Sequence, residues 1–143
     1  MNFLRSFNIT GSGLTAQRLR MDVISQNIAN ARVTRTEGGG PYRRKMVVLS
    51  SIESGEDSFA SALQKAAGGG VQVEAIAEDP SELVPIYEPD HPDADEDGYV
   101  MYPNVNTAQE MIDMLGASRA YEANVTAFNA VKAMALKALE IGR

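Results

Sequence analysis

Cysteine and tryptophan are absent from this chain of 143 residues, and histidine occurs once, as His91. Without cysteine, the chain can form no disulfide, no cysteine-ligated zinc site and no thiol nucleophile. The single imidazole also excludes any site that needs two histidines. No apolar run approaches the length of about 18 residues that a transmembrane helix requires. The first eight residues lack the apolar core and the cleavage site of a secretory signal, so a protein with this N-terminus would need another route to leave the cytoplasm.

Charge is distributed unevenly along the chain. Residues 1–36 carry five arginines and one acidic residue, a net charge of +4. Residues 37–104 carry fourteen acidic and four basic residues, a net charge of −10, and residues 105–143 are balanced. The arginines are dispersed and no aromatic cluster accompanies them, so no nucleic-acid partner is expected. We interpret them as charges on a helix that face solvent or another protein.

Residues 3–31 are predicted to form an amphipathic helix. Apolar residues recur every seven positions, and a companion series is offset from them by three or four. Gly11 and Gly13 each weaken the helix by about 1 kcal/mol relative to alanine, so it could instead begin near Thr15. The apolar seam is predicted to be an assembly interface, and it consists of Phe7, Leu14, Met21 and Ile28.

Residues 105–142 predict a second, longer helix. The segment is rich in alanine, methionine, leucine, glutamate and lysine and contains no proline. Thr107 and Glu110 have the spacing of a capping box at its start. Apolar residues form two stripes, so the helix must bury more than one side, and neighbouring molecules are expected to cover what this small chain cannot. The residues predicted for that contact are Leu115, Tyr121, Val125, Phe128, Val131 and Leu139.

The centre of the chain predicts short strands. They are Tyr42–Leu49, Val71–Ala77, Leu83–Tyr87 and Tyr99–Tyr102. Pro85 has no amide donor, which favours a sheet edge for the third strand. Residues 51–67 form either a surface loop or a short helix over 59–66, and the sequence does not decide between these two.

Together the elements predict an α+β fold. Two long terminal helices form an antiparallel coiled-coil pair, with a small β-rich central domain inserted between them. The expected parts are the N-terminal helix of the helical core over 1–36, the central domain over 37–104 and the C-terminal helix over 105–143. Pairing is expected because each amphipathic helix needs a partner for its apolar seam.

The acidic segment Asp93–Gly98 is the strongest indication of a chemical site. It matches the first half of a calcium-binding loop, but Asn104 occupies the position that requires a bidentate glutamate. We therefore predict an acidic turn that ends at a glycine with positive φ and leads into a strand, without a metal ion. His91 lies between Asp90 and Pro92 without a second histidine or a thiol, and we interpret it as a loop residue.

The glycines and cations of residues 38–45 have neither the spacing nor the following helix of a phosphate-binding loop. The cations Arg43, Arg44 and Lys45 are either a patch that contacts the acidic centre of a neighbouring copy or a solvated strand end. The sequence contains no set of residues with the pattern of a catalytic triad or a dinucleotide site. We therefore expect no enzymatic activity, no cofactor and no small-molecule substrate.

Two terminal segments carry a family resemblance. Ser25–Ala31 resembles the N-terminal signature of flagellar axial proteins, which are the rod, hook and hook-associated subunits, and Ala117–Asn124 resembles their C-terminal signature. Each lies at the expected end of the chain, and the agreement of both is more specific than either alone. Further similarity, in segments such as residues 39–45 and 98–105, points to the short proximal rod subunits of that family.

The resemblance implies a structural subunit of the bacterial flagellar basal body. Family members are exported unfolded through the flagellar export apparatus and assemble helically in the periplasm, where the terminal helices line the export channel and the rod transmits torque. The implied partners are other copies of the chain, neighbouring rod proteins and proteins at the junction of membrane ring and rod. The alternative is a small acidic export chaperone or adaptor that dimerises through its helices, which sedimentation would distinguish by its closed dimer.

Overall fold

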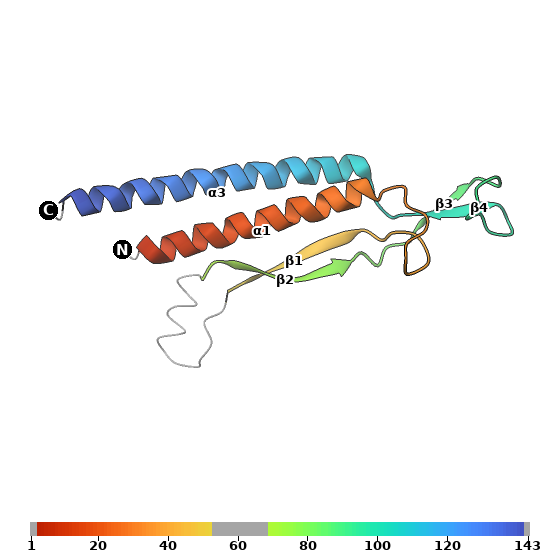
Figure 1. The fold of residues 1–143 in the computed structure, drawn as a ribbon, viewed down its shortest axis with the longest axis horizontal. Helices are drawn as coiled ribbons and strands as arrows, with labels where there is room; N and C mark the ends of the chain where they lie inside the picture. Colours follow the sequence, from red (N-terminus) through yellow and green to blue (C-terminus); the bar gives the residue numbers. More distant parts are fainter. Residues whose placement is uncertain (1–2, 53–68, 142–143) are drawn as a thin grey trace, which may run out of the picture.

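The computed structural model describes residues 3–52 and 69–141 and has two long helices around four short strands. The helices lie antiparallel, with both ends of the chain at the same end of the molecule (Figure 1). This arrangement confirms the predicted α+β fold and the pairing of the terminal helices. The elements are α1 (Phe3–Ala29), β1 (Lys45–Ser51), β2 (Val71–Glu78), β3 (Val84–Tyr87), β4 (Tyr99–Tyr102) and α3 (Thr107–Ile141).

Helix α1 is the middle layer of the molecule. It contacts α3 on one side and the antiparallel hairpin of β1 and β2 on another (Figure 1). Because two layers cover it, α1 supplies more buried residues than any other element, namely Ala16, Val23, Ile24 and Asn27. Helix α3 has only one covered side within the described chain, and its buried residues are Glu110 and Ala117.

Helix α1 runs without a break through Gly11 and Gly13, so the alternative start near Thr15 is wrong. Gly13 faces α3 closely, because a methyl group placed on it would lie 3.1 Å from the side-chain nitrogen of Asn124. A glycine at this position therefore lets the two helices approach. A methyl group on Gly11 would meet no described atom within 4 Å.

The start of α3 differs from the prediction. The cap is Asn106, whose Oδ1 accepts hydrogen bonds from the amides of Ala108 at 3.1 Å and Gln109 at 3.2 Å. The predicted capping box of Thr107 and Glu110 is wrong, because the carboxylate of Glu110 turns inward and binds other segments. The spacing of a capping box alone does not show where the carboxylate points.

The four predicted strands are present, with four of their eight boundaries shifted by one to three residues. Strand β1 begins at Lys45 instead of Tyr42, because the amide of Tyr42 donates to the carbonyl of Val33 and the amide of Arg44 donates to Asn104. Strands β3 and β4 form a separate two-stranded sheet, in which Val84 is opposite Tyr102. This sheet extends beyond the end of the helix pair (Figure 1).

The sequence leaves open whether residues 51–67 form a surface loop or a short helix. Most of this segment, residues 53–67, lies outside the described residues. Among the residues that are described, no helix has the length and hydropathy needed to cross a membrane.

Candidate functional site

Asn27 joins three segments of the chain through one fully used side chain. Its Nδ2 donates to the carbonyl oxygen of Lys45 at 2.9 Å and to Oε2 of Glu110 at 3.0 Å. Its Oδ1 accepts from the hydroxyl of Tyr42 and from the amide of Lys45, both at 2.9 Å. An amide has two donors and two acceptor lone pairs, so every position is occupied. We call the group formed by Asn27, Tyr42, Arg44 and Glu110 the polar hub.

An ion pair completes the polar hub. Nε of Arg44 donates to Oε1 of Glu110 at 2.6 Å, and the two side chains are 23% and 1% exposed. The guanidinium also faces the carboxylates of Asp79 at 3.4 Å and Asp113 at 3.7 Å. Removing one member of a buried pair leaves an uncompensated charge and costs about 3 to 5 kcal/mol. Arg44 therefore ties the start of β1 to α3.

The pKa shifts of Arg44 and Tyr42 agree with these contacts. Burial acts against the charged form of Arg44, but its hydrogen bond to Glu110 and the charge of that carboxylate, with help from Asp79, raise its pKa. Burial also raises the pKa of the Tyr42 phenol, and the charges of Glu110 and Glu78 add to this effect. The hub therefore holds a charged guanidinium and a neutral phenol.

The three cations of the predicted interface patch, Arg43, Arg44 and Lys45, have different surroundings. Arg44 is inside the polar hub, so the interpretation of all three as a solvated strand end is wrong for this residue. Arg43 donates from a guanidinium nitrogen to the carbonyl of Ser81 at 3.3 Å in an exposed position. The ammonium of Lys45 lies 5.7 Å from the centre of the Tyr42 ring. Their contact with neighbouring subunits stays a prediction.

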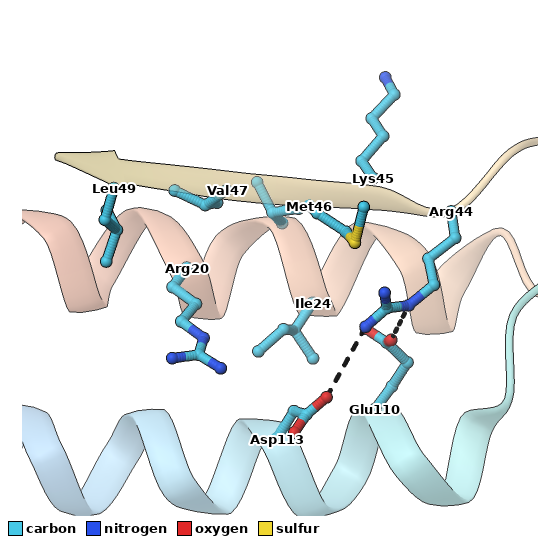
Figure 2. Close-up of a pocket in the computed structure, with 10 residues that line it drawn as sticks. Arg20, Ile24, Arg44, Lys45, Met46, Val47, Leu49, Glu110 and Asp113 are labelled. Atoms are coloured by element: carbon cyan, nitrogen blue, oxygen red, sulfur yellow. Dashed lines mark hydrogen bonds and ion pairs between the residues drawn. The ribbon is translucent and has the colours of Figure 1, made fainter. Parts of the chain in front are cut away.

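A cavity of about 320 Å³ opens beside the hub, between α1, α3 and β1. Figure 2 shows Ile24 from α1 and Met46 from β1 on its apolar side, with Glu110 and Asp113 of α3 opposite. Arg20 points into the same space from α1 (Figure 2). The cavity combines apolar lining with charges of both signs, and it is a gap between layers of the fold.

The predicted seam of α1 lies partly against α3 of the same chain. Phe7 packs on Phe128 with ring centres 5.0 Å apart in an edge-to-face arrangement. The predicted residues Leu14, Met21 and Ile28 are half-buried, and Tyr121, Val125 and Val131 on α3 are half-buried as well. The buried residues of α1 are Ala16, Val23, Ile24 and Asn27, and none of them is among the four seam residues predicted for assembly.

Two predicted interface residues on α3 are more than half exposed to solvent in the single chain. Leu115 is 52% exposed and Leu139 is 72% exposed. Large apolar neighbours are exposed at both ends of this helix, and they are Met111, Ile112, Met134, Leu136 and Ile141. Helix α3 thus has the second apolar side that the sequence predicts.

The acidic segment forms the predicted turn. Oδ1 of Asp95 accepts hydrogen bonds from the amides of Asp97 and Tyr99, and Gly98 has φ +82° directly before β4. Oδ2 of Asp93 accepts from the hydroxyl of Thr34 at 2.9 Å. These carboxylates thus bind protein groups, and in the described ranges no three His, Cys, Asp or Glu residues are placed to hold a metal ion.

His91 lies in the loop between β3 and β4, as expected. Its Nδ1 accepts a hydrogen bond from the amide of Asp93 at 3.1 Å. The imidazole therefore stabilises the turn locally.

Family models match both ends of the chain. Residues 7–35 match the flagella basal body rod protein model, and residues 96–141 match the C-terminal model of the flagellar basal body rod FlgEFG proteins. These segments include most of α1 and all of α3. The two terminal helices are therefore similar to those of flagellar basal-body rod proteins.

Relatives that match over their whole length identify the branch. The chain is 48% identical over 153 residues to the flagellar basal-body rod protein FlgC of Bacillus subtilis, with 100% of both chains covered. It is 46% identical to FlgC of Borreliella burgdorferi, covering 99% of this chain and 98% of the relative. It is 42% identical to FlgC of Escherichia coli O157:H7, with 100% of both covered.

The chain belongs to the FlgC family, and it is a structural subunit of the flagellar basal-body rod that assembles with other rod components. The resemblance seen in Ser25–Ala31 and Ala117–Asn124 is thus confirmed. No observation favours a dimeric export adaptor, because the named relatives are rod proteins.

Proposed function

We propose that the chain is a subunit of the proximal rod that assembles helically through the exposed sides of its terminal helices. Its partners are other copies, neighbouring rod proteins and proteins at the junction of membrane ring and rod. In this assembly the helices line the export channel and the subunit transmits torque. The chain reaches the periplasm unfolded through the flagellar export apparatus, without a cleaved signal peptide.

The observation that carries this proposal is the uncovered side of α3. Leu115, Leu136 and Leu139 are each more than half exposed, although they belong to a helix of 35 residues packed on α1. Fully burying one such side chain contributes about 1.5 to 3 kcal/mol. The exposed apolar side chains of α3 form two groups, one near its start and one near its end, and such groups mark sites of protein association. Neighbouring subunits supply the missing cover.

The polar hub suits a subunit that transmits force. Asn27, Tyr42 and Glu110 come from α1, from the segment before β1 and from α3, and their bonds fix these segments relative to one another. A fully satisfied buried network specifies one arrangement more strictly than apolar packing alone. Torque then passes between the helices and the hairpin without a change of their relative position.

Leu139→Glu tests the proposed assembly. Leu139 is 72% exposed, so the free subunit should keep its fold, while a carboxylate in a contact between helices should prevent rod formation. The variant is expressed in cells that lack the native subunit, and swimming and isolated basal bodies are scored. Ala75→Glu is the matched control, because Ala75 is exposed on β2 and the same charge is added there. Normal rods with Leu139→Glu would contradict the proposal.

Arg43 and Lys45 are proposed to contact neighbouring subunits as well. Arg44 cannot be included in this test, because its loss would leave Glu110 unpaired inside the fold. The double variant Arg43→Ala with Lys45→Ala should leave stability within about 0.5 kcal/mol, as expected for surface positions. It should reduce motility in the same cells. Unchanged swimming would count against this patch.

A further inference from the structure

The distal sheet of β3 and β4 has an apolar face that the described chain leaves open. Tyr87 is opposite Tyr99 and Pro85 is opposite Met101, so these four side chains share one face. The tyrosine rings meet edge to face with centres 5.4 Å apart. Tyr87, Tyr99 and Met101 are 63%, 44% and 45% exposed. On the other face Val100 is 1% exposed, Ile86 39% and Val84 48%. We call the first face the aromatic tip.

The border of the aromatic tip is mostly acidic, and the nearby cation Arg35 pairs with the carboxylate of Asp93 at 3.6 Å. Residues 82–102 contain seven acidic residues and no lysine or arginine. The carboxylates of Asp93 and Asp95 are occupied by hydrogen bonds from within the chain. Asp90, Glu96 and Asp97 are exposed, and within the described part of the chain their carboxylates have no hydrogen-bond or ion-pair partner. A partner must therefore offer an apolar surface beside a cation.

One surface of the same chain has that chemistry. At the start of α3, Ile112 and Leu115 are 64% and 52% exposed and lie three residues apart on the outward side. Arg119 follows one turn later, is exposed, and has no partner within the described ranges. From Ile112 to Arg119 the helix rises by about 10 Å, close to the length of a four-residue strand, about 13 Å. We call these three residues the α3 stripe.

We propose that the aromatic tip of one copy docks on the α3 stripe of a second copy. Tyr87, Tyr99 and Met101 lie over Ile112 and Leu115, and a carboxylate of the acidic border faces Arg119. The sheet that carries the tip extends beyond the end of the helix pair of its own chain (Figure 1), and we assign the α3 stripe of another molecule as its partner. Because the two surfaces differ, the contact is heterologous and can repeat without closing, as a rod requires.

The proposal rests on the assembly between copies proposed above, but it uses a surface other than Leu139. Cysteine cross-linking tests it, because the chain contains no cysteine of its own. The variant Met101→Cys with Leu115→Cys is expressed in cells that lack the native subunit. A short bis-maleimide is then added to basal bodies isolated from these cells. The expected product is a ladder of dimers, trimers and higher multimers of this chain.

The matched control is Met101→Cys with Met134→Cys. Met134 is 50% exposed on the same helix, but it lies near the opposite end of the molecule. This pair should give no ladder. A ladder from the control pair and none from the first pair would overturn the proposal. Products that stop at the dimer, which indicate a closed two-fold contact, and cross-links to a different protein would also overturn it.

A charge reversal gives an independent readout. Arg119→Glu in the double-cysteine chain should reduce the ladder several-fold, and Glu96→Arg with Asp97→Arg should restore it. Restoration supports the predicted pairing, while a ladder that Arg119→Glu leaves unchanged contradicts it. Rods that form without the predicted ladder would refute the docking alone. Rods that form without this chain would refute the proposed function.

Discussion

Replacing Asn27 by alanine tests the central role of the polar hub in the fold. Asn27 is 1% exposed and its side chain makes four hydrogen bonds, with lengths between 2.9 and 3.0 Å. The substitution leaves the amide and the carbonyl of Lys45 without their partner and removes one donor from Glu110. It also removes the acceptor of the Tyr42 hydroxyl.

The expected loss of stability follows from these contacts. Each hydrogen bond contributes about 0.5 to 1.5 kcal/mol net, and a buried group left without a partner costs about 1 to 3 kcal/mol. Water that enters the vacated space offsets part of this, so we expect Asn27→Ala to lower the free energy of unfolding by about 3 kcal/mol. For a chain of this size, that corresponds to a fall in melting temperature of about 10 °C.

Asn30→Ala is the matched control. Asn30 belongs to the same signature, but its side chain makes a single exposed hydrogen bond, to the carbonyl of Gln26 at 2.8 Å. Its removal should cost about 0.5 kcal/mol or less. Both variants are unfolded with urea and followed by circular dichroism. If Asn27→Ala is no less stable than Asn30→Ala, the hub does not hold the free chain together and the reasoning is refuted.

Four further substitutions test three separate features. Gly11→Ala should stabilise the chain by about 0.5 to 1 kcal/mol, because alanine favours a helix and no described atom lies near the added methyl group, whereas Gly13→Ala should gain less because it presses on a side chain of α3. Urea titration of both variants measures this, and an equal gain would contradict the close approach. Burial, aided by two neighbouring carboxylates, raises the pKa of Tyr42 from 10.0, so its stabilising effect is complete below pH 10 and is lost as the pH rises through the raised folded value. Unfolding of the native chain and Tyr42→Phe across this range should show a smaller alkaline loss for the variant, and parallel curves would exclude this role. Gly98→Ala should cost about 1 to 2 kcal/mol in thermal unfolding because φ is +82° there, and an unchanged melting temperature would show that the turn relaxes.

The terminal helices and the four strands were predictable because their signals are local. Sevenfold periodicity up to Ile28 and an alanine-rich segment after Asn106 indicate helices without knowledge of the fold. Alternation in Val71–Ala77 and the acidic turn before Tyr99 indicate strands in the same way. The exposed second side of α3 was also predictable, because it follows from the number of apolar stripes and the size of the chain.

The polar hub was not predictable from sequence, because its members are far apart in the chain. Asn27 and Glu110 are separated by 83 positions, and Arg44 stands among cations that look like surface residues. The only local signal was a run of polar residues near the end of a helix, where a glutamine or asparagine is usually explained by fraying. Glu110 had a local explanation as part of a capping box. The tertiary partners replaced that role with a buried ion pair.

A density map of the isolated basal body, with this chain traced, tests the account most directly. We expect other protein chains to cover the outward side of α3, including Leu115 and Leu139, which are 52% and 72% exposed in the single chain. We also expect the hub contact between Arg44 and Glu110 inside each subunit. A map in which the outward side of α3 faces solvent along its length would contradict assembly through the terminal helices.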